Sequence, residues 1–159
     1  MSKNKYNHLL LFSLYLSQGL PFGFQATALP AYLRHSGVSL AIIGYSTALS
    51  LPWMFKAFWS PMVDAFYVSS FGRRKSWIVP LQILLVASML CAFFTINSGL
   101  SLLLINLFVM NFFAATQDIA VDALAVDILS ERDLGTGNIA QVVGYKCGMI
   151  VSGGILVAL

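Results

Sequence analysis

Three aspartates interrupt an apolar stretch of the sequence that reads NFFAATQDIAVDALAVDIL and runs from Asn111 to Leu129. At about 100° per residue, five of its positions fall on one face of a helix: Asn111, Ala115, Asp118, Asp122 and Ala125. Most other positions carry aliphatic or aromatic side chains. The polar face must therefore look toward other helices or a hydrated cavity, and not toward lipid.

Two lysines lie at a depth that matches these acids. A charge alone in the hydrocarbon layer costs at least about 3 kcal/mol, so it needs an opposite charge, a proton or several donors. At 1.5 Å per residue, Lys56 and Lys146 lie about 12 Å from the predicted cytoplasmic ends of their segments, Asp118 about 15 Å and Asp122 about 10 Å. We expect these four side chains to converge on one layer. Such a layer either binds an anionic or polar solute or relays protons, or its fixed ion pairs only hold the helices together.

The first apolar segment carries a second polar face. Four residues share it by helical spacing, namely Tyr15, Gln18, Phe22 and Gln25. Pro21 lies beside this face and removes one backbone hydrogen bond, which predicts a kink. Gln18 and Gln25 are candidates for hydrogen bonds to a solute, and the alternative is a hydrogen bond between helices.

Small residues at helical spacing mark the last segment. Gly144, Gly148 and Ser152 form a row that permits close approach of another helix. Because this row faces away from Lys146, one side of the helix is predicted to pack and the other to present the amine.

The composition requires a membrane class. The 159 residues are 58% hydrophobic and 9% charged, with a mean hydropathy of +0.82. Soluble domains contain about 25% charged residues, so an ordinary globular core is excluded. Two cysteines in apolar runs imply neither a disulfide framework nor a zinc site, and we predict no metal and no cofactor. The net charge is +3, but most of the basic residues fall in the predicted loops and termini of a membrane protein, so no nucleic-acid partner is expected.

The apolar runs predict five membrane-spanning helices. A helix is the only solution for an open chain in lipid, because each backbone amide must be satisfied within its own segment. The expected class is all-α, with residues 1–159 as one part of a bundle. The predicted spans are 8–33, 39–66, 77–96, 101–129 and 138–159, with a loop at 67–76.

The basic residues predict the orientation. Six of nine fall on one side, and only Arg34 falls on the other. The six are Lys3, Lys5, Arg73, Arg74, Lys75 and Arg132. The excess of basic residues on cytoplasmic loops places the N-terminus in the cytoplasm, in a membrane that the sequence leaves open. The alternative for the first segment is a cleaved signal peptide, since Lys3 and Lys5 precede it and Ala26–Ala28 imitates a cleavage site.

The loop at 67–76 follows an aspartate that needs a donor. Asp64 ends a predicted helix, where the helix dipole disfavours an anion. Gly72 and the basic residues Arg73, Arg74 and Lys75 follow in the loop. They predict a clasp that holds one conformational state and releases in another. The alternative is a basic cluster that only sets the topology.

This segment, SPMVDAFYVSSFGRRKSW, resembles the loop signature of the major facilitator superfamily. Ser60 stands where that signature has its leading glycine, and extra residues separate Asp64 from Gly72. With LPWMFKAFWSPMVD, ATQDIAVDALAVDIL, YLSQGLPFGFQ and LGTGNIAQVVGYKCGMIVSGG, the chain is similar to the branch that contains acetyl-coenzyme A transporters and bacterial muropeptide permeases. The likeness covers nearly the whole chain.

The resemblance implies twelve helices in two halves and alternating access around a central site lined by the first and fourth helices. It also implies transport of an organic anion such as acetyl-CoA, with five of the twelve helices present here and the remaining helices as partners. Two alternatives are a truncated, non-transporting scaffold, suggested by the end at Leu159, and an intramembrane enzyme. Against the enzyme, Asp118 and Asp122 share one helix, whereas an aspartyl dyad takes one acid from each of two helices.

Overall fold

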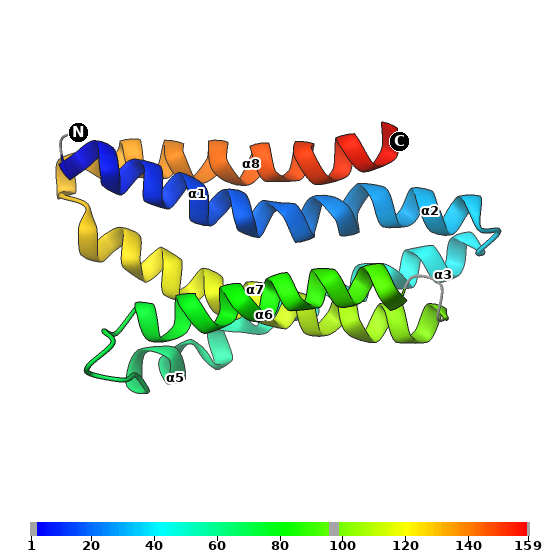
Figure 1. Cartoon of the computed structure of the whole chain (residues 1–159), viewed down its shortest axis with the longest axis horizontal. Coiled ribbons are helices and arrows are strands. Elements are labelled where there is room, and N and C mark those ends of the chain that lie inside the picture. Colours follow the sequence, from blue (N-terminus) through cyan, green and yellow to red (C-terminus); the bar gives the residue numbers. More distant parts are fainter. Residues whose placement is uncertain (1–2, 96–98, 159) are drawn as a thin grey trace. The chain divides into compact units, whose positions relative to one another are not determined.

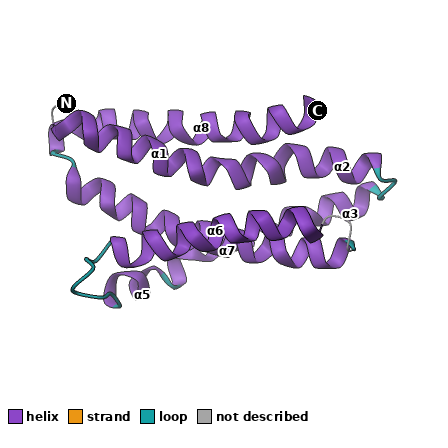
Figure 2. Cartoon of the chain, in the orientation of Figure 1, coloured by secondary structure: helices purple, strands orange, loops and turns teal. Residues whose placement is uncertain are grey.

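The computed structural model of the chain describes residues 3–95 and 99–158, and the described residues are helical apart from short connections (Figures 1 and 2). No strand occurs in these two ranges. The predicted ends of the third and fifth spans, Ile96 and Leu159, lie outside the described residues.

The first segment is helical from Lys3 to His35, and one π-helix interrupts its α-helical hydrogen bonding. Its parts are α1 (Lys3–Gly23), the π-helix η1 (Phe24–Ala28) and α2 (Leu29–His35). Pro21 lies inside α1, and proline removes a backbone hydrogen bond and clashes with the carbonyl four residues before it. The π-helix begins three residues later, so the irregularity predicted at Pro21 takes the form of a widened turn.

The second segment is a series of short helices where the sequence predicted one span from 39 to 66. Its parts are α3 (Leu40–Tyr45), η2 (Ser46–Ser50), α4 (Leu51–Phe55), η3 (Lys56–Phe58) and α5 (Ser60–Ala65), of which η2 and η3 are 3₁₀-helices. Pro52 and Pro61 each lie in the first turn of a new α-helix. Proline is tolerated there and not in a helix interior, which explains why the helix restarts at both positions.

The remaining helices are long. They are α6 (Lys75–Thr95), α7 (Leu100–Ile128) and α8 (Leu134–Ala158), with the 3₁₀-helix η4 (Glu131–Asp133) before α8. Among the described residues, α6 and α7 are long and apolar enough to cross a membrane. The other three predicted spans stay predictions.

The chain divides into two compact units, each considered by itself. Unit 1 consists of residues 1–36 and 121–159, and unit 2 of residues 37–120. In unit 1, α1 packs along α8 (Figure 1). The core of unit 2 includes Leu81 and Leu85 of α6 and Leu103, Leu107 and Met110 of α7.

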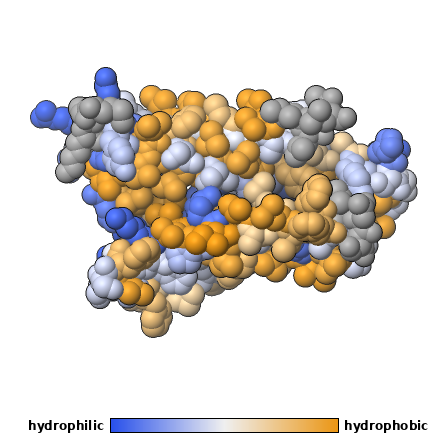
Figure 3. Space-filling view, in the orientation of Figure 1, coloured by the Kyte–Doolittle hydropathy of each residue, from blue (hydrophilic) through white to orange (hydrophobic). Residues whose placement is uncertain are grey.

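Large apolar side chains are exposed on the long helices. Ile83 and Phe93 of α6 are 65% and 74% exposed, and Ile150 of α8 is 70% exposed. Hydrophobic residues also cover much of the face seen in Figure 3. A soluble monomer rarely exposes so much contiguous apolar surface, whereas a helix in lipid presents it to the acyl chains.

Candidate functional site: intramembrane charges and a loop clasp

An ion pair lies within unit 2. The Nζ atom of Lys56, the first residue of η3, donates to Oδ2 of Asp118 on α7. The Asp118 side chain is 10% exposed and the Lys56 side chain 31%. The Lys56 amine also lies 5.6 Å from the centre of the Trp53 ring, which is within the range of a cation–π interaction. Two of the four predicted charges are therefore paired directly.

Two indoles connect the same segment to α7. Trp53 Nε1 donates to Asn111 Oδ1 over 3.1 Å, and Trp59 Nε1 donates to Thr116 Oγ1 over 3.1 Å. Trp53 lies in α4, Lys56 begins η3 and Trp59 follows η3. Residues three apart in a helical segment are neighbours on one face, so these three side chains contact α7 from one side of the segment.

A pair of amides links α6 to α7 in the same unit. Gln117 Nε2 donates to Gln82 Oε1 over 2.5 Å, and Gln117 is fully buried. Gln117 Oε1 has no hydrogen-bond partner among the described residues. Buried polar atoms are nearly always paired with protein or ordered water, so the Gln117 oxygen is an exception in this unit.

Asp122 lies in unit 1 and takes different partners. Its Oδ1 accepts a hydrogen bond of 2.6 Å from the Tyr15 hydroxyl and one of 3.5 Å from Gln141 Nε2. These three residues line a pocket of about 270 Å³ together with Asn138 and apolar side chains of α7 and α8. The carboxylate therefore borders a space large enough for several water molecules or a small solute.

The two predicted glutamines of α1 and η1 are buried. Gln18 is 0% exposed and Gln25 is 7% exposed. Neither amide atom of Gln18 has a hydrogen-bond partner within the described chain. An amide left without partners in a buried position costs about 1–3 kcal/mol.

The small-residue row of α8 lies against α1. A Cβ atom at Gly144 would lie 2.6 Å from the Phe12 carbonyl oxygen, and one at Gly148 would lie 3.0 Å from Gly19 Cα. Ser152 is buried, and its hydroxyl donates to the Gly148 carbonyl over 3.1 Å. Lys146 is exposed and forms no ion pair with any described residue.

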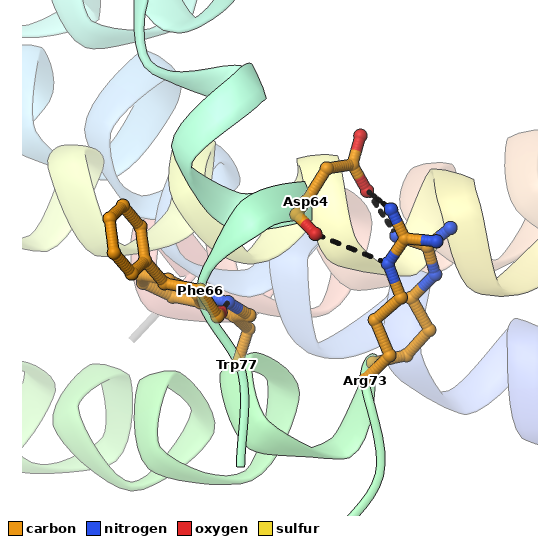
Figure 4. Close-up of polar contacts among 5 residues, drawn as sticks. Asp64, Phe66, Arg73 and Trp77 are labelled. Carbon is orange, nitrogen blue, oxygen red and sulfur yellow. Dashed lines mark hydrogen bonds and ion pairs between the residues drawn. The ribbon is translucent and has the colours of Figure 1, made fainter. Parts of the chain in front are cut away.

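The loop residues form a compact clasp around Asp64 in unit 2. Arg74 Nη1 and Arg73 Nη2 donate to Asp64 Oδ1 over 2.6 Å and 3.3 Å, and Arg73 Nε donates to the Asp64 carbonyl over 3.3 Å (Figure 4). The Arg74 side chain is 13% exposed, whereas Arg73 and Asp64 are each about half exposed. Two guanidinium groups on one carboxylate offset the unfavourable dipole at the end of α5.

The backbone of the loop brings the arginines into place. Gly72 has φ +99°, a conformation that glycine adopts without the strain of a Cβ atom. The Ser76 hydroxyl donates to the Gly72 carbonyl over 2.8 Å, and Trp77 Nε1 donates to the Phe66 carbonyl over 2.6 Å. Lys75 begins α6, is exposed, and forms no ion pair within the described residues.

Sequence reasoning missed Gln82, Gln117, Trp59 and Gln141 as members of these contacts. A signal was available for the glutamines, because each is an amide within an otherwise apolar helix. Gln141 and Asn138 are also three residues apart, which places them on one helical face. The contact of Trp59 with Thr116 had no comparable signal, because indole and hydroxyl groups commonly occur in membrane helices without contacting each other.

The helices and buried charges define an all-α membrane protein. The sequence model of the acetyl-coenzyme A transporter 1 family matches residues 7–159, so the chain belongs to that family.

Named relatives agree with this membership. The chain is 34% identical to the anhydromuropeptide permease of Escherichia coli over 92% of its own length and 30% of the permease. It is 36% identical to an uncharacterized protein of Schizosaccharomyces pombe, over 98% of the chain and 31% of that protein. It is 32% identical to an uncharacterized membrane protein of Saccharomyces cerevisiae, over 94% and 31%. The chain thus spans about a third of the length of these relatives. No solved structure matches it.

Proposed function

We propose that this chain forms part of a secondary transporter that moves an organic anion across a membrane by alternating access, with acetyl-CoA as the best candidate substrate. The observation that carries the proposal is the Lys56–Asp118 ion pair on the polar face of an apolar helix. Family membership supports transport, and the family description supplies the name of the substrate. We assign the chain no enzymatic role.

In this proposal, Lys56 exchanges partners. Its amine binds Asp118 in the absence of solute and binds the anionic group of the solute in its presence. Because one ammonium group cannot fully neutralise two anions, binding of the solute frees Asp118 to take up a proton. Asp118 or Asp122 thereby couples protons to transport. Lys146 attracts the solute by its positive charge, and Gln18 and Gln25 donate hydrogen bonds to the solute.

The clasp around Asp64 gates the cycle. We propose that the contacts of Arg73 and Arg74 with Asp64 hold one state and break in the other, with Gly72 and Lys75 at the moving end of the loop. The N-terminus and this loop lie in the cytoplasm, and the remaining helices of the complete protein close the cavity. Labelling of single cysteines at positions 3 and 70 from one side of sealed vesicles tests this orientation.

Transport is tested in proteoliposomes that contain the complete protein, with uptake of radiolabelled acetyl-CoA at two pH values. Removing one charge-assisted contact costs about 1.5–3 kcal/mol. At substrate concentrations below saturation, Lys56→Gln and Lys146→Gln should therefore each lower the rate of uptake about tenfold. Lys5→Gln, which removes a lysine to which no role in transport is assigned, should leave uptake unchanged. Unchanged KM and maximal rate in Lys56→Gln would refute the role of that lysine. Absence of uptake by the unmodified protein would refute the substrate.

A further inference from the structure

A second pocket lies in unit 2, on the opposite side of the loop segment from the clasp. It has a volume of about 470 Å³ and is lined by Phe66, Tyr67, Val68, Ser76, Trp77, Pro80, Leu81 and Leu84. We call it the loop groove. In Figure 4, Phe66 and Trp77 lie on one side of the backbone and the Asp64–Arg73 contact lies on the other. The proposed transport function does not use this groove.

The position of the groove corresponds to the boundary between membrane and water. Its upper part consists of residues 66–68, in the loop between α5 and α6, and its floor consists of the first turns of α6 from Ser76 to Leu84. From Trp77 to Leu84 the helix rises about 10 Å, roughly a third of the hydrocarbon thickness. The lining includes Tyr67 and Trp77, and these two residue types concentrate at this boundary.

Hydrogen bonds keep the groove open. Trp77 Nε1 is held by the Phe66 carbonyl at 2.6 Å. The Ser76 hydroxyl accepts from the Val68 amide at 3.1 Å and is 3.3 Å from the Val68 carbonyl. The Trp77 indole and the Ser76 hydroxyl are thus paired within the protein, and most of the other lining side chains are apolar, which suits a hydrocarbon chain.

Basic residues next to the groove favour a lipid with an anionic head group. Residues 64–75 contain three basic residues and one acidic residue, which is a net charge of +2. Lys75 immediately precedes the lining residue Ser76, is exposed and is unpaired within the described chain. Half of the Arg73 side chain is exposed as well. Basic residues at the end of a membrane helix attract anionic head groups.

We propose that the loop groove binds an anionic glycerophospholipid. One acyl chain lies along Trp77, Leu81 and Leu84, and the phosphate group lies beside Lys75.

Brominated lipids quench tryptophan fluorescence on contact and therefore report binding at Trp77. The complete protein would be placed in bilayers of phosphatidylcholine with equal mole fractions of dibrominated phosphatidylglycerol or dibrominated phosphatidylcholine. The signal of Trp77 is the difference between the unmodified protein and Trp77→Phe. We expect stronger quenching by the brominated phosphatidylglycerol. Because each basic residue near the surface attracts anionic lipid, Lys75→Gln should lower the relative association constant about fivefold.

Two variants separate the groove from general electrostatic attraction. Lys5→Gln removes one basic charge from unit 1 and should leave the preference unchanged. Leu84→Phe narrows the groove and should reduce quenching of Trp77 by both lipids, with the protein still folded by size-exclusion chromatography. Equal quenching by the two lipids would overturn the proposal. Absence of quenching by either lipid would also overturn it, since another part of the complete protein would then cover the groove.

Discussion

The two compact units join their helices by different means. In unit 1, α1 and α8 approach at glycines, so that a Cβ at Gly144 or Gly148 would meet the opposite backbone. In unit 2, α7 is joined to its neighbours by side chains, through an ion pair to Lys56, indole hydrogen bonds from Trp53 and Trp59, and an amide pair with Gln82. The first contact depends on shape and the second on chemical complementarity.

This difference predicts different sensitivities to mutation. Within lipid there is little hydrophobic force between helices, so association rests on close packing or on interhelical polar contacts. Close packing fails when volume is added, whatever the polarity of the added group. A polar contact tolerates changes of volume but fails when one partner is removed and the other stays buried.

The largest effect is expected from added volume in unit 1. Gly148→Val introduces a branched side chain where the nearest atoms belong to the Leu16 and Gly19 backbone, which cannot move aside as a flexible side chain can. We expect a loss of about 3 kcal/mol in stability, measured from the midpoint of thermal unfolding in detergent. Gly154→Val on the same helix is the control, because the nearest atom to its Cβ is a side-chain methyl at 3.9 Å. Equal losses in both variants would contradict the glycine contact.

The next effect should follow from removing one charge in unit 2. Lys56→Met leaves the Asp118 side chain, which is 10% exposed, without its ion pair. We expect a destabilisation of about 2 kcal/mol, below the range for fully buried pairs because Lys56 is partly exposed. The double variant Lys56→Met with Asp118→Asn should recover part of the loss, and thermal unfolding measures the coupling. Strict additivity of the two changes would show that the pair contributes nothing.

A smaller effect is expected at the polar contact of unit 1. Tyr15→Phe keeps the ring and removes the hydroxyl that donates to Asp122 over 2.6 Å. Since hydrogen bonds to charged groups contribute about 1.5–3 kcal/mol, we expect a loss of about 1.5 kcal/mol in thermal unfolding. Tyr6→Phe on the same helix, at a tyrosine that is 60% exposed, should change stability by less than about 0.5 kcal/mol. Equal losses of stability in Tyr15→Phe and Tyr6→Phe would show that the hydrogen bond from Tyr15 to Asp122 does not stabilise unit 1.

The smallest effect is expected from the backbone of the loop. Gly72 has φ +99°, so Gly72→Ala introduces strain of about 1 kcal/mol. Gly44→Ala within α3 should be neutral or stabilising, because nothing lies within 4 Å of its Cβ and alanine favours the helix. The midpoint of thermal unfolding should therefore fall for Gly72→Ala and stay the same or rise for Gly44→Ala, and no fall for Gly72→Ala would exclude backbone strain at Gly72.

Much of the architecture follows from local features of the sequence. The long helices α6, α7 and α8 lie within a few residues of the predicted segments, because hydropathy and helical periodicity are properties of neighbouring residues. The predicted helix at 39–66 is instead several short helices. The prolines at 52 and 61 were visible, but whether a proline kinks a helix or restarts it depends on which neighbours satisfy the freed carbonyl groups.

The sequence by itself determined the membrane class, the helical secondary structure, the polar face that holds Asp118 and Asp122, and the basic loop after Asp64. Only the tertiary structure decided which partner each polar group takes. Asp118 meets Lys56, whereas Asp122 meets Tyr15 and Gln141. Two acids one helical turn apart lie on the same face of the helix, so the sequence pattern does not distinguish them. Their partners depend on the rotation and register of the neighbouring helices, which are set by packing between residues far apart in the chain.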